Sequence, residues 1–272
     1  MDKTLDKAVI LARGLGTRMQ RPDPRAALDP RQDDVAQTGI KAMIPVGRPL
    51  VDHVLSVVAE AGLREVCLVI GPEQDALRKH VDGLRPERLS IALAVQQEPR
   101  GTADAVAAAE GFAGRDDFVV INCDNYYPLE SLTWLRGQSG PAVALFDSES
   151  LVAGSNISRQ RLLRFAVGEI SGDGFLKRIV EKPDAAMLAS LRPPIAVSMN
   201  CWRFGPAIFE ACRSISPSVR GELELTDAVQ RAIDVLGIRF RAGVIHAPVF
   251  DLTSRGDIAA VTAVLAGREV RL

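Results

Sequence analysis

The chain has few aromatic residues, almost no charge imbalance and no long apolar run. Aromatic residues make up 5% of its 272 positions, and 33 basic side chains stand against 34 acidic ones, a formal charge of −1. A dedicated nucleic-acid binder normally carries a basic excess, and a membrane helix needs ~20 apolar residues in succession. We therefore expect neither nucleic acid nor a membrane among its partners. The composition also excludes disorder, collagen and a coiled coil.

Cysteine is scarce as well. The four cysteines are scattered and form no CxxC pair, and Cys67 and Cys123 lie within apolar, strand-like runs. Such positions favour buried, reduced thiols in a cytoplasmic protein over zinc ligands or disulfides. Two aspartates precede the first apolar segment, so we expect no signal peptide.

Short apolar runs alternate with longer amphipathic ones along the chain, which predicts βαβ crossovers. The expected strands are Ala8–Ala12, Val66–Ile70, Ile91–Val95, Phe118–Asn122, Ala142–Phe146, Ala196–Phe204 and Arg239–Ile245, with a hairpin formed by Leu162–Ile170 and Phe175–Val180. The expected helices are Leu50–Ala61, Glu73–Val81, Ala103–Gly111, Leu129–Gly137, Pro206–Cys212, Leu225–Val235 and Ser254–Leu265, the last with a capping box of Ser254 and Asp257. The pattern predicts an α/β fold with three layers and a doubly wound, mixed, mostly parallel sheet.

One segment interrupts this alternation. Residues 19–39 contain three prolines, four aspartates and three arginines but few large apolar residues. This composition predicts a long solvated loop directly after the first strand. Long loops in compact domains are usually functional, and we interpret this one as a lid over a ligand.

The first strand runs into a loop with two glycines, Gly14 and Gly16. Glycines at the carboxyl end of a parallel strand let backbone amides approach an anion. The loop does not fit the dinucleotide fingerprint GxGxxG, because Met19 occupies the third glycine position, and no GK[ST] of a P-loop follows. Two glycines alone fit a simple tight turn equally well.

Further motifs accompany this loop in a fixed order. They are Leu11-Ala12-Arg13-Gly14-Leu15-Gly16-Thr17-Arg18, the segment from Lys41 to Leu50, Gln96-Gln97-Glu98-Pro99-Arg100-Gly101-Thr102-Ala103-Asp104-Ala105, Asn122-Cys123-Asp124-Asn125, Glu181-Lys182-Pro183, and the segment from Arg220 to Asp227. Together they resemble the sugar-1-phosphate nucleotidylyltransferases, also called NDP-sugar pyrophosphorylases, over roughly Lys7 to Leu265. The resemblance implies a single Rossmann-like nucleotidyltransferase domain over residues 1–272. About residues 1–125 would bind the nucleotide and about residues 126–272 the acceptor.

The implied reaction transfers a nucleoside monophosphate from a nucleoside triphosphate to a sugar 1-phosphate, giving an NDP-sugar and pyrophosphate. A triphosphate of charge about −4 must meet a phosphate of about −2, so cations have to cancel the repulsion. The resemblance implies Mg²⁺ as cofactor, a role in nucleotide-sugar biosynthesis and a cytoplasmic location. Homo-oligomers are common in the family, although no motif here predicts one. We expect no C-terminal β-helix of the kind some relatives carry.

The resemblance also implies roles for individual residues. The implied catalytic residues are Arg18, Lys41, Asp124 and Lys182: Arg18 and Lys41 hold the triphosphate, and Lys182 binds the sugar's phosphate. Asp124 and Asp251 are the implied metal ligands, since Mg²⁺ prefers carboxylate and phosphate oxygens. Each residue alone also fits a plainer role, as a solvated cation or as an aspartate that closes a turn.

The implied contacts with the two substrates fall on both halves of the chain. Those with the nucleotide are Leu11, Ala12, Gly14, Gly16, Thr17, Arg18, Gln96, Gly101 and Thr102; those with the acceptor are Asn125, Glu181, Lys182, Asn200 and Arg220. An amide side chain can pair with the polar edge of a base, so base recognition should come from Gln96 and the turn at Gly101. Thr102 also fits a helix cap. The motif does not settle which base is bound.

Some positions depart from the family pattern. Arg13 replaces a small residue in the phosphate loop, where it either adds a phosphate contact or crowds the nucleotide. Asn122 and Asn200 stand where glycine is common, and Leu252 and Thr253 follow Asp251 where small residues are usual.

These departures leave two other functions open. One is a catalytically silent homologue that binds a nucleotide sugar and regulates a partner. The other is an enzyme of the same fold with a different acceptor, such as an alcohol phosphate. Trp202, where the family often has tyrosine, hints at the latter, although it equally fits a core strand. A dehydrogenase is disfavoured because the dinucleotide fingerprint is missing.

Overall fold

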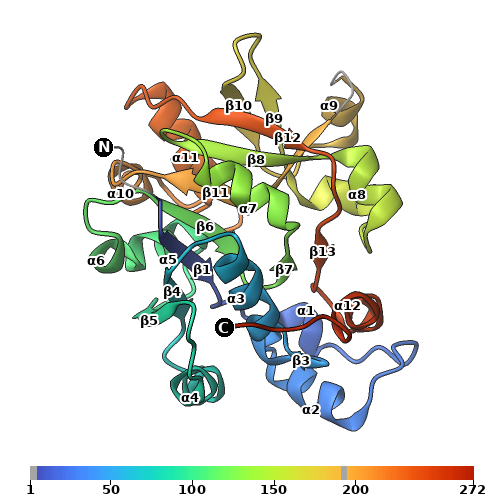
Figure 1. Cartoon of the computed structure of the whole chain (residues 1–272). Helices are drawn as coiled ribbons and strands as arrows, with labels where there is room; N and C mark the ends of the chain where they lie inside the picture. The colour runs from blue at the N-terminus through green and yellow to red at the C-terminus, as the bar shows by residue number, and fades with distance from the viewer. Residues whose placement is uncertain (1–4, 191–194) are drawn as a thin grey trace.

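The computed structural model describes residues 5–190 and 195–272, which form three layers around a central sheet (Figure 1). Within this part of the chain the sheet has nine strands, in the order β10-β9-β11-β6-β1-β4-β5, with β8 paired to β11 and β12 paired to β8. Helices cover both of its faces. The expected α/β fold with a doubly wound, mixed sheet is confirmed.

The half of the sheet built first along the chain is parallel. Its strands are β1 (Lys7–Leu11), β4 (Glu65–Ile70), β5 (Ser90–Val95) and β6 (Phe118–Asn122). Side chains of β1 enter both cores in alternation, with Ala8 and Ile10 on one face and Val9 on the other. Burial on both faces is why these strands are apolar throughout, and all four expected strands are confirmed to within one residue at each end.

The other half of the sheet contains the antiparallel pairs. Its strands are β8 (Ala142–Asp147), β9 (Ala166–Ile170), β10 (Leu176–Val180), β11 (Ala196–Phe204) and β12 (Arg241–Ile245). β11 runs antiparallel to β6, β8 and β9, whereas β12 runs parallel to β8. The expected hairpin forms between β9 and β10. Its first arm begins at Ala166 and not at Leu162, because residues 159–164 form the 3-10 helix η2 (Arg159–Arg164).

Two apolar cores separate the helices from the sheet. One face carries α3 (Leu50–Glu60), α4 (Asp75–Gly83), α7 (Leu129–Arg136), α8 (Ser148–Gly154) and α12 (Ile258–Leu265). The other carries α5 (Thr102–Ala108), α6 (Glu110–Ala113), α10 (Ile208–Arg213) and α11 (Leu225–Asp234). The sequence did not predict α8, and the expected helix 103–111 is divided into α5 and α6. Trp202 is fully buried and stacks on Phe204 with ring centres 5.5 Å apart, so it is a core residue.

The prediction of a structureless loop over residues 19–39 is wrong. The segment begins within α1 (Thr17–Gln20) and contains α2 (Pro30–Thr38). Asp29 and Gln32 form a capping box at the start of α2, and Pro30 takes its first position, a combination that favours a helix start. Gln32 donates to the backbone oxygen of Pro45 at 2.9 Å, which ties the helix to the body of the protein. Our interpretation of the segment as a lid stays a prediction.

Short elements complete the described part of the chain. They are η1 (Lys41–Met43), β2 (Pro45–Val46), β3 (Arg48–Pro49), β7 (Asn125–Tyr126), α9 (Ala185–Ser190), β13 (Phe250–Asp251) and η3 (Arg255–Asp257). The expected capping box of Ser254 and Asp257 is confirmed at η3. All four cysteines are free and buried, as expected. None of the helices in the described ranges has the length and apolar character needed to cross a membrane.

Candidate active site

A cavity of about 340 Å³ opens at the carboxyl ends of the parallel strands, the edge where open α/β sheets bind ligands. Loops that follow β1, β5 and β6 supply most of its wall. Its lining includes Leu11, Ala12, Arg13, Gly14, Gly16, Thr17, Arg18, Lys41, Gln96, Gly101, Thr102 and Asp124. The structure thus brings together all the residues for which the sequence predicted nucleotide contacts.

A second cavity, of about 220 Å³, adjoins the first. Its lining includes the five predicted acceptor residues, Asn125, Glu181, Lys182, Asn200 and Arg220. Both predicted metal ligands line it as well. Arg18, Thr102, Asn122, Asp124, Glu222 and Thr253 belong to both cavities, so a ligand in one cavity can meet a ligand in the other beside Asp124.

Lys41 and Asp124 form an ion pair where the two cavities meet. Lys41 comes from η1 and Asp124 directly follows β6, and 83 positions separate them in the chain. Their side chains are 12% and 26% exposed. Arg18, on α1, is exposed and lines both cavities. Three of the four predicted catalytic residues, Arg18, Lys41 and Asp124, therefore line the first cavity, and Lys182 lines the second.

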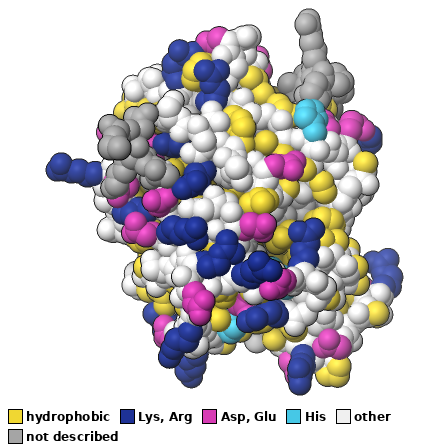
Figure 2. All heavy atoms as spheres, in the orientation of Figure 1, with side chains coloured by type: hydrophobic (Ala, Val, Ile, Leu, Met, Phe, Trp, Pro, Cys, Tyr) yellow, Lys and Arg dark blue, Asp and Glu magenta, His cyan; other side chains and the backbone are white. Residues whose placement is uncertain are grey.

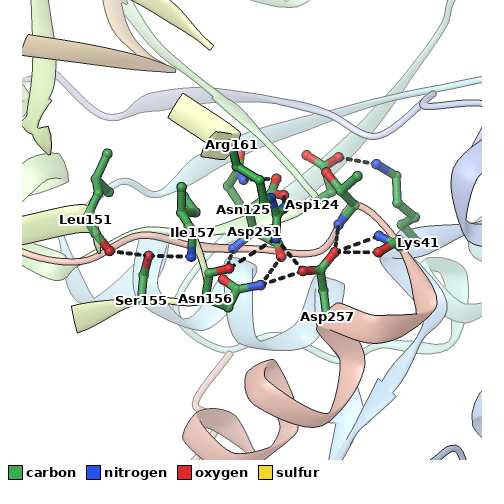
Figure 3. A network of polar contacts seen from close by, with 12 residues as sticks. Lys41, Asp124, Asn125, Leu151, Ser155, Asn156, Ile157, Arg161, Asp251 and Asp257 are labelled. Carbon is green, nitrogen blue, oxygen red and sulfur yellow. Dashed lines mark hydrogen bonds and ion pairs between the residues drawn. The ribbon is translucent and has the colours of Figure 1, made fainter. Parts of the chain in front are cut away.

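A short antiparallel ribbon brings Asp251 to Asp124. β13 pairs with β7 so that Asp251 lies opposite Asn125, the neighbour of Asp124. The backbone N–H of Leu252 donates to the backbone oxygen of Asp124 at 2.8 Å, and Asn125 Nδ2 donates to Asp251 Oδ1 at 2.9 Å. Figure 3 shows these side chains together. The expected convergence of two distant aspartates is present.

The carboxyl of Asp251 is nearly fully buried, at 4% exposure. Burial, followed by the negative charge of Asp124, raises its pKa, because both disfavour the ionised form. Arg161 opposes this effect by donating to Asp251 Oδ2.

Arg161 lies at the centre of a polar network that the sequence did not predict (Figure 3). Besides Asp251, it donates to Asp257 Oδ1 at 2.5 Å and to the backbone oxygen of Asn156 at 3.1 Å. Asn156 Nδ2 donates to the backbone oxygen of Asp251 at 2.7 Å and to Asp257 Oδ1 at 2.9 Å. The network thus fixes both the side chain and the backbone of Asp251. The only available signal was the capping position of Asp257, which says nothing about Arg161.

Two residues of the second cavity have left-handed backbones. Lys182 has φ 46° and Asn200 has φ 55°, and within the described residues they are the non-glycine positions with positive φ. Asparagine tolerates this region, whereas for lysine it is strained. At Asn200 the register between β11 and β8 shifts, and Trp202 Nε1 donates to Asn200 Oδ1 at 3.4 Å. Backbone strain of this kind is concentrated at ligand sites.

Carboxylates surround Arg220, which also lines this cavity. Its guanidinium contacts Glu224, Glu181 at 3.5 Å and Glu222 at 3.9 Å. Burial, and next the charge of Glu224, raise the pKa of Glu181 to about 7, although Arg220 and a hydrogen bond from Thr226 act in the opposite direction. Glu181 is therefore poised to change charge near neutral pH.

This pKa predicts a pH-dependent stability difference for Glu181→Gln. Between pH 4.5 and about 7 the unfolded chain releases the Glu181 proton while the folded protein keeps it. The free energy of unfolding of the wild type, relative to that of the variant, should therefore fall by on the order of 2 kcal/mol as the pH rises through this range. Above this range the difference should stay constant. Urea unfolding of both proteins at pH 4.5 and pH 8 measures the difference. A difference that is the same at both pH values would contradict the raised pKa.

The turn at Gly101 joins the nucleotide cavity to α11. Its φ of 124° lies in a region that glycine adopts and other residues rarely do. A Cβ at this position would also approach the backbone oxygen of Leu223 to 2.5 Å. Gln96 Nε2 donates to the backbone oxygen of Gly101 at 3.0 Å. Thr102 does not cap its own helix; its hydroxyl accepts from the backbone N–H of Leu225 at 2.9 Å, at the start of α11.

Basic and acidic side chains are mixed over the face drawn in Figure 2, with basic ones gathered across its middle. Since the formal charge is −1, the overall field does little to attract an anion. Attraction for a phosphorylated ligand therefore depends on the local cations of the site, Arg18, Lys41, Lys182 and Arg220.

A glycine loop after the first strand of a doubly wound sheet, with cations and two aspartates around it, is an arrangement in α/β proteins that can bind phosphorylated ligands. The chain belongs to the nucleotidyl transferase family, whose model matches residues 7–236.

Named relatives are similar to this chain over most of its length. Glucose-1-phosphate thymidylyltransferase of Streptomyces griseus is 33% identical over 231 residues, and low-salt glycan biosynthesis nucleotidyltransferase Agl11 of Haloferax volcanii is 28% identical over 232. Both alignments cover 84% of this chain and 57% of the relative, so the chain spans little more than half the length of these relatives. UTP–glucose-1-phosphate uridylyltransferase AglF of Haloferax volcanii is 26% identical over 239 residues, which are 85% of this chain and 88% of the relative.

Solved structures share the fold. The crystal structure of a UDP-glucose pyrophosphorylase complexed with UDP-glucose matches with a TM-score of 0.74, over 97% of this chain and 100% of that chain. The two sequences are 21% identical, so this likeness shows the fold alone.

Proposed function

We propose that the protein transfers a nucleoside monophosphate from a nucleoside triphosphate to a sugar 1-phosphate and releases pyrophosphate. The observation that carries the proposal is the meeting of two cavities at Asp124, beside Lys41 and Asp251. Two phosphorylated substrates need two adjoining sites with cations between them. The named sugar-1-phosphate nucleotidylyltransferases among the relatives support the choice of acceptor.

The two substrates would occupy the two cavities. The triphosphate lies in the first, formed mainly by residues 1–125, with its phosphates on the glycine loop and Arg18. The sugar phosphate lies in the second, formed mainly by residues 126–272, against Lys182. Its phosphate oxygen is already ionised and needs no base, so the protein's contribution is to align it with the α-phosphorus and to cancel charge. The ammonium group of Lys41 can contact the triphosphate beside Asp124, where the two cavities meet.

The donor chemistry of the site fits a magnesium ion. No cluster of three or more metal-binding side chains is present in residues 5–190 and 195–272. Mg²⁺, however, commonly takes one or two carboxylates from the protein and the rest of its ligands from substrate and water. Asp124 and Asp251 would hold it, and a cation there would relieve the repulsion from Asp124 that, after burial, raises the pKa of Asp251. When bound, the ion would neutralise phosphate charge.

Pyrophosphate release tests the proposal. The protein is incubated with Mg²⁺ and each pairing of UTP, dTTP, GTP, CTP or ATP with a panel of sugar 1-phosphates and alcohol phosphates. We expect release that requires both substrates and the metal. Binding of a triphosphate without release in any pairing would favour the silent homologue, and release with alcohol phosphates alone would favour the other acceptor class.

Substitution of Lys182 should separate acceptor binding from the chemical step. Lys182→Ala removes a cation from the acceptor cavity and keeps a Cβ at the left-handed position. We expect the KM for sugar 1-phosphate to rise about tenfold or more, with kcat changed less, because an ion pair to the bound phosphate is lost. Lys177→Ala on β10, the strand that precedes Lys182, serves as the control and should leave KM unchanged, since its side chain is 63% exposed. An unchanged KM in Lys182→Ala would remove this residue from the acceptor site.

We also infer a cytoplasmic location, which the four buried free thiols support, because reducing compartments keep cysteines unpaired. Homo-oligomerisation stays a prediction.

A further inference from the structure

Arg13 is a buried cation with an unused donor. The residue is 9% exposed, and its Nη1 has no hydrogen-bond partner among the described residues. Its bonds to Glu73, from Nε and Nη2, are both 3.4 Å long, and the Glu73 side chain is 53% exposed. A guanidinium stays charged in proteins, and a buried donor without a partner costs free energy. Arg13 lines the nucleotide cavity, so a bound ligand can supply the missing acceptor.

The sheet topology places this guanidinium on the side of the cavity that lies away from Asp124. Loops follow the strands in the order β6, β1, β4, β5 along the sheet edge. Asp124 follows β6, and Arg13 leaves the end of β1 toward Glu73, which follows β4. Gln74 fixes this loop by donating to the backbone oxygen of Ala12 at 3.1 Å. Gln96 follows β5, the strand next to β4, so the contact with Glu73 turns Arg13 to the side of the sheet edge that carries Gln96, opposite to the side of Asp124.

Gln96 presents an acceptor in the same part of the cavity. Its Nε2 donates to the backbone oxygen of Gly101 at 3.0 Å and to Asp104 Oδ2 at 2.8 Å. Both partners only accept, so they determine which end of the amide carries the nitrogen. The remaining atom, Oε1, has no hydrogen-bond partner within the described part of the chain, and Gln96 lines the cavity. The cavity therefore offers one charged donor and one neutral acceptor for a ligand.

We propose that Arg13 is a specificity-determining residue that donates from Nη1 to a carbonyl oxygen of the nucleobase, while Gln96 Oε1 accepts from the adjacent ring N–H. This inference rests on the proposed function. It assigns the nucleotide to the class with a carbonyl beside a ring N–H, namely uracil, thymine or guanine. Where that carbonyl is O4 of uracil or thymine, or O6 of guanine, cytosine or adenine in the same position would turn an amino group toward Arg13 and a ring nitrogen acceptor toward Gln96. Both contacts would then be repulsive, and specificity of this kind comes from polar groups left unpaired.

Direct binding measurements test the role of Arg13 without turnover. The dissociation constants of UTP, dTTP, GTP, CTP, ATP and inorganic tripolyphosphate are measured by calorimetry in the absence of sugar phosphate. We expect the wild type to prefer at least one of the first three over CTP and ATP by about tenfold or more, the value of a charge-assisted hydrogen bond. Arg13→Ala should reduce this preference to near equality and leave tripolyphosphate binding unchanged.

The controls separate the possible failures. Arg178→Ala removes an exposed arginine on β10 outside both cavities and should change none of the constants. If Arg13→Ala weakened all the triphosphates and tripolyphosphate equally, Arg13 would be a phosphate contact and the inference would fail alone. An unchanged base preference in Arg13→Ala would also overturn it alone. If the wild type bound none of the nucleotides, the proposed function itself would fail, and this inference with it.

Discussion

Asp124→Asn should reduce the rate of pyrophosphate release about a thousandfold or more, because the amide cannot supply the anionic oxygen around which both cavities are arranged. Asp124 lines both cavities, pairs with Lys41 and lies beside Asp251. The substitution changes neither size nor shape, so the loops after β1 and β5 should keep their geometry. Steady-state assays with saturating substrates and Mg²⁺ measure the loss.

A matched control and a binding assay make the result for Asp124 specific. Asp82→Asn, at an exposed position on α4 outside both cavities, makes the same chemical change and should leave turnover as it is. Tripolyphosphate binding to Asp124→Asn without metal should be retained, which shows that the site is intact. Wild-type turnover in Asp124→Asn would overturn the assignment of the site.

Arg161→Ala should lower the free energy of unfolding by about 3–5 kcal/mol, the cost of removing one partner from a buried ion pair. The Arg161 side chain is 17% exposed, and its two partners, Asp251 and Asp257, are 5% and 8% exposed. Without Arg161, two neighbouring carboxylates would remain buried with no cation from this network. Urea unfolding near neutral pH, followed by circular dichroism, measures the difference.

Arg159 provides the control for this prediction. It lies two positions away on η2 and forms an ion pair with Glu149 in which both side chains are mostly exposed, at 68% and 63%. Exposed ion pairs contribute little to stability, so Arg159→Ala should unfold at nearly the same urea concentration as the wild type. If Arg161→Ala did so too, the network would have no structural role in holding Asp251.

The expectations that agree with the structure depend mostly on local pattern. Apolar runs of five or six residues between amphipathic segments predicted β1, β4, β5 and β6, because burial on both faces of a parallel sheet requires such runs. The glycine loop and the capping box of Ser254 and Asp257 could be read in the same way. The signature of α2, Asp29-Pro30 followed by Gln32, was also present in the sequence, but the abundance of proline and aspartate favoured a loop.

The parts that the sequence missed depend on contacts between distant segments. β13 has two residues, too few for any periodicity, and its pairing with β7 joins positions 126 apart. Arg161 directly precedes a segment predicted as a strand, and nothing near it in the sequence indicates that Asp251 and Asp257 are its partners. The orientation of Arg13 toward Glu73 likewise depends on the order of strands in the sheet.

The class of fold, the glycine loop and the set of charged residues that a phosphorylated ligand requires could all be predicted from the residues alone. These follow from residue type and short-range spacing, which act before the chain is folded. The positions of Asp251 beside Asp124, of Arg161 against Asp251 and of Arg13 against Glu73 could be learned only from the three-dimensional arrangement. Sheet pairing and the need of buried charges for partners select such neighbours. These two effects act only when segments far apart in the chain come together.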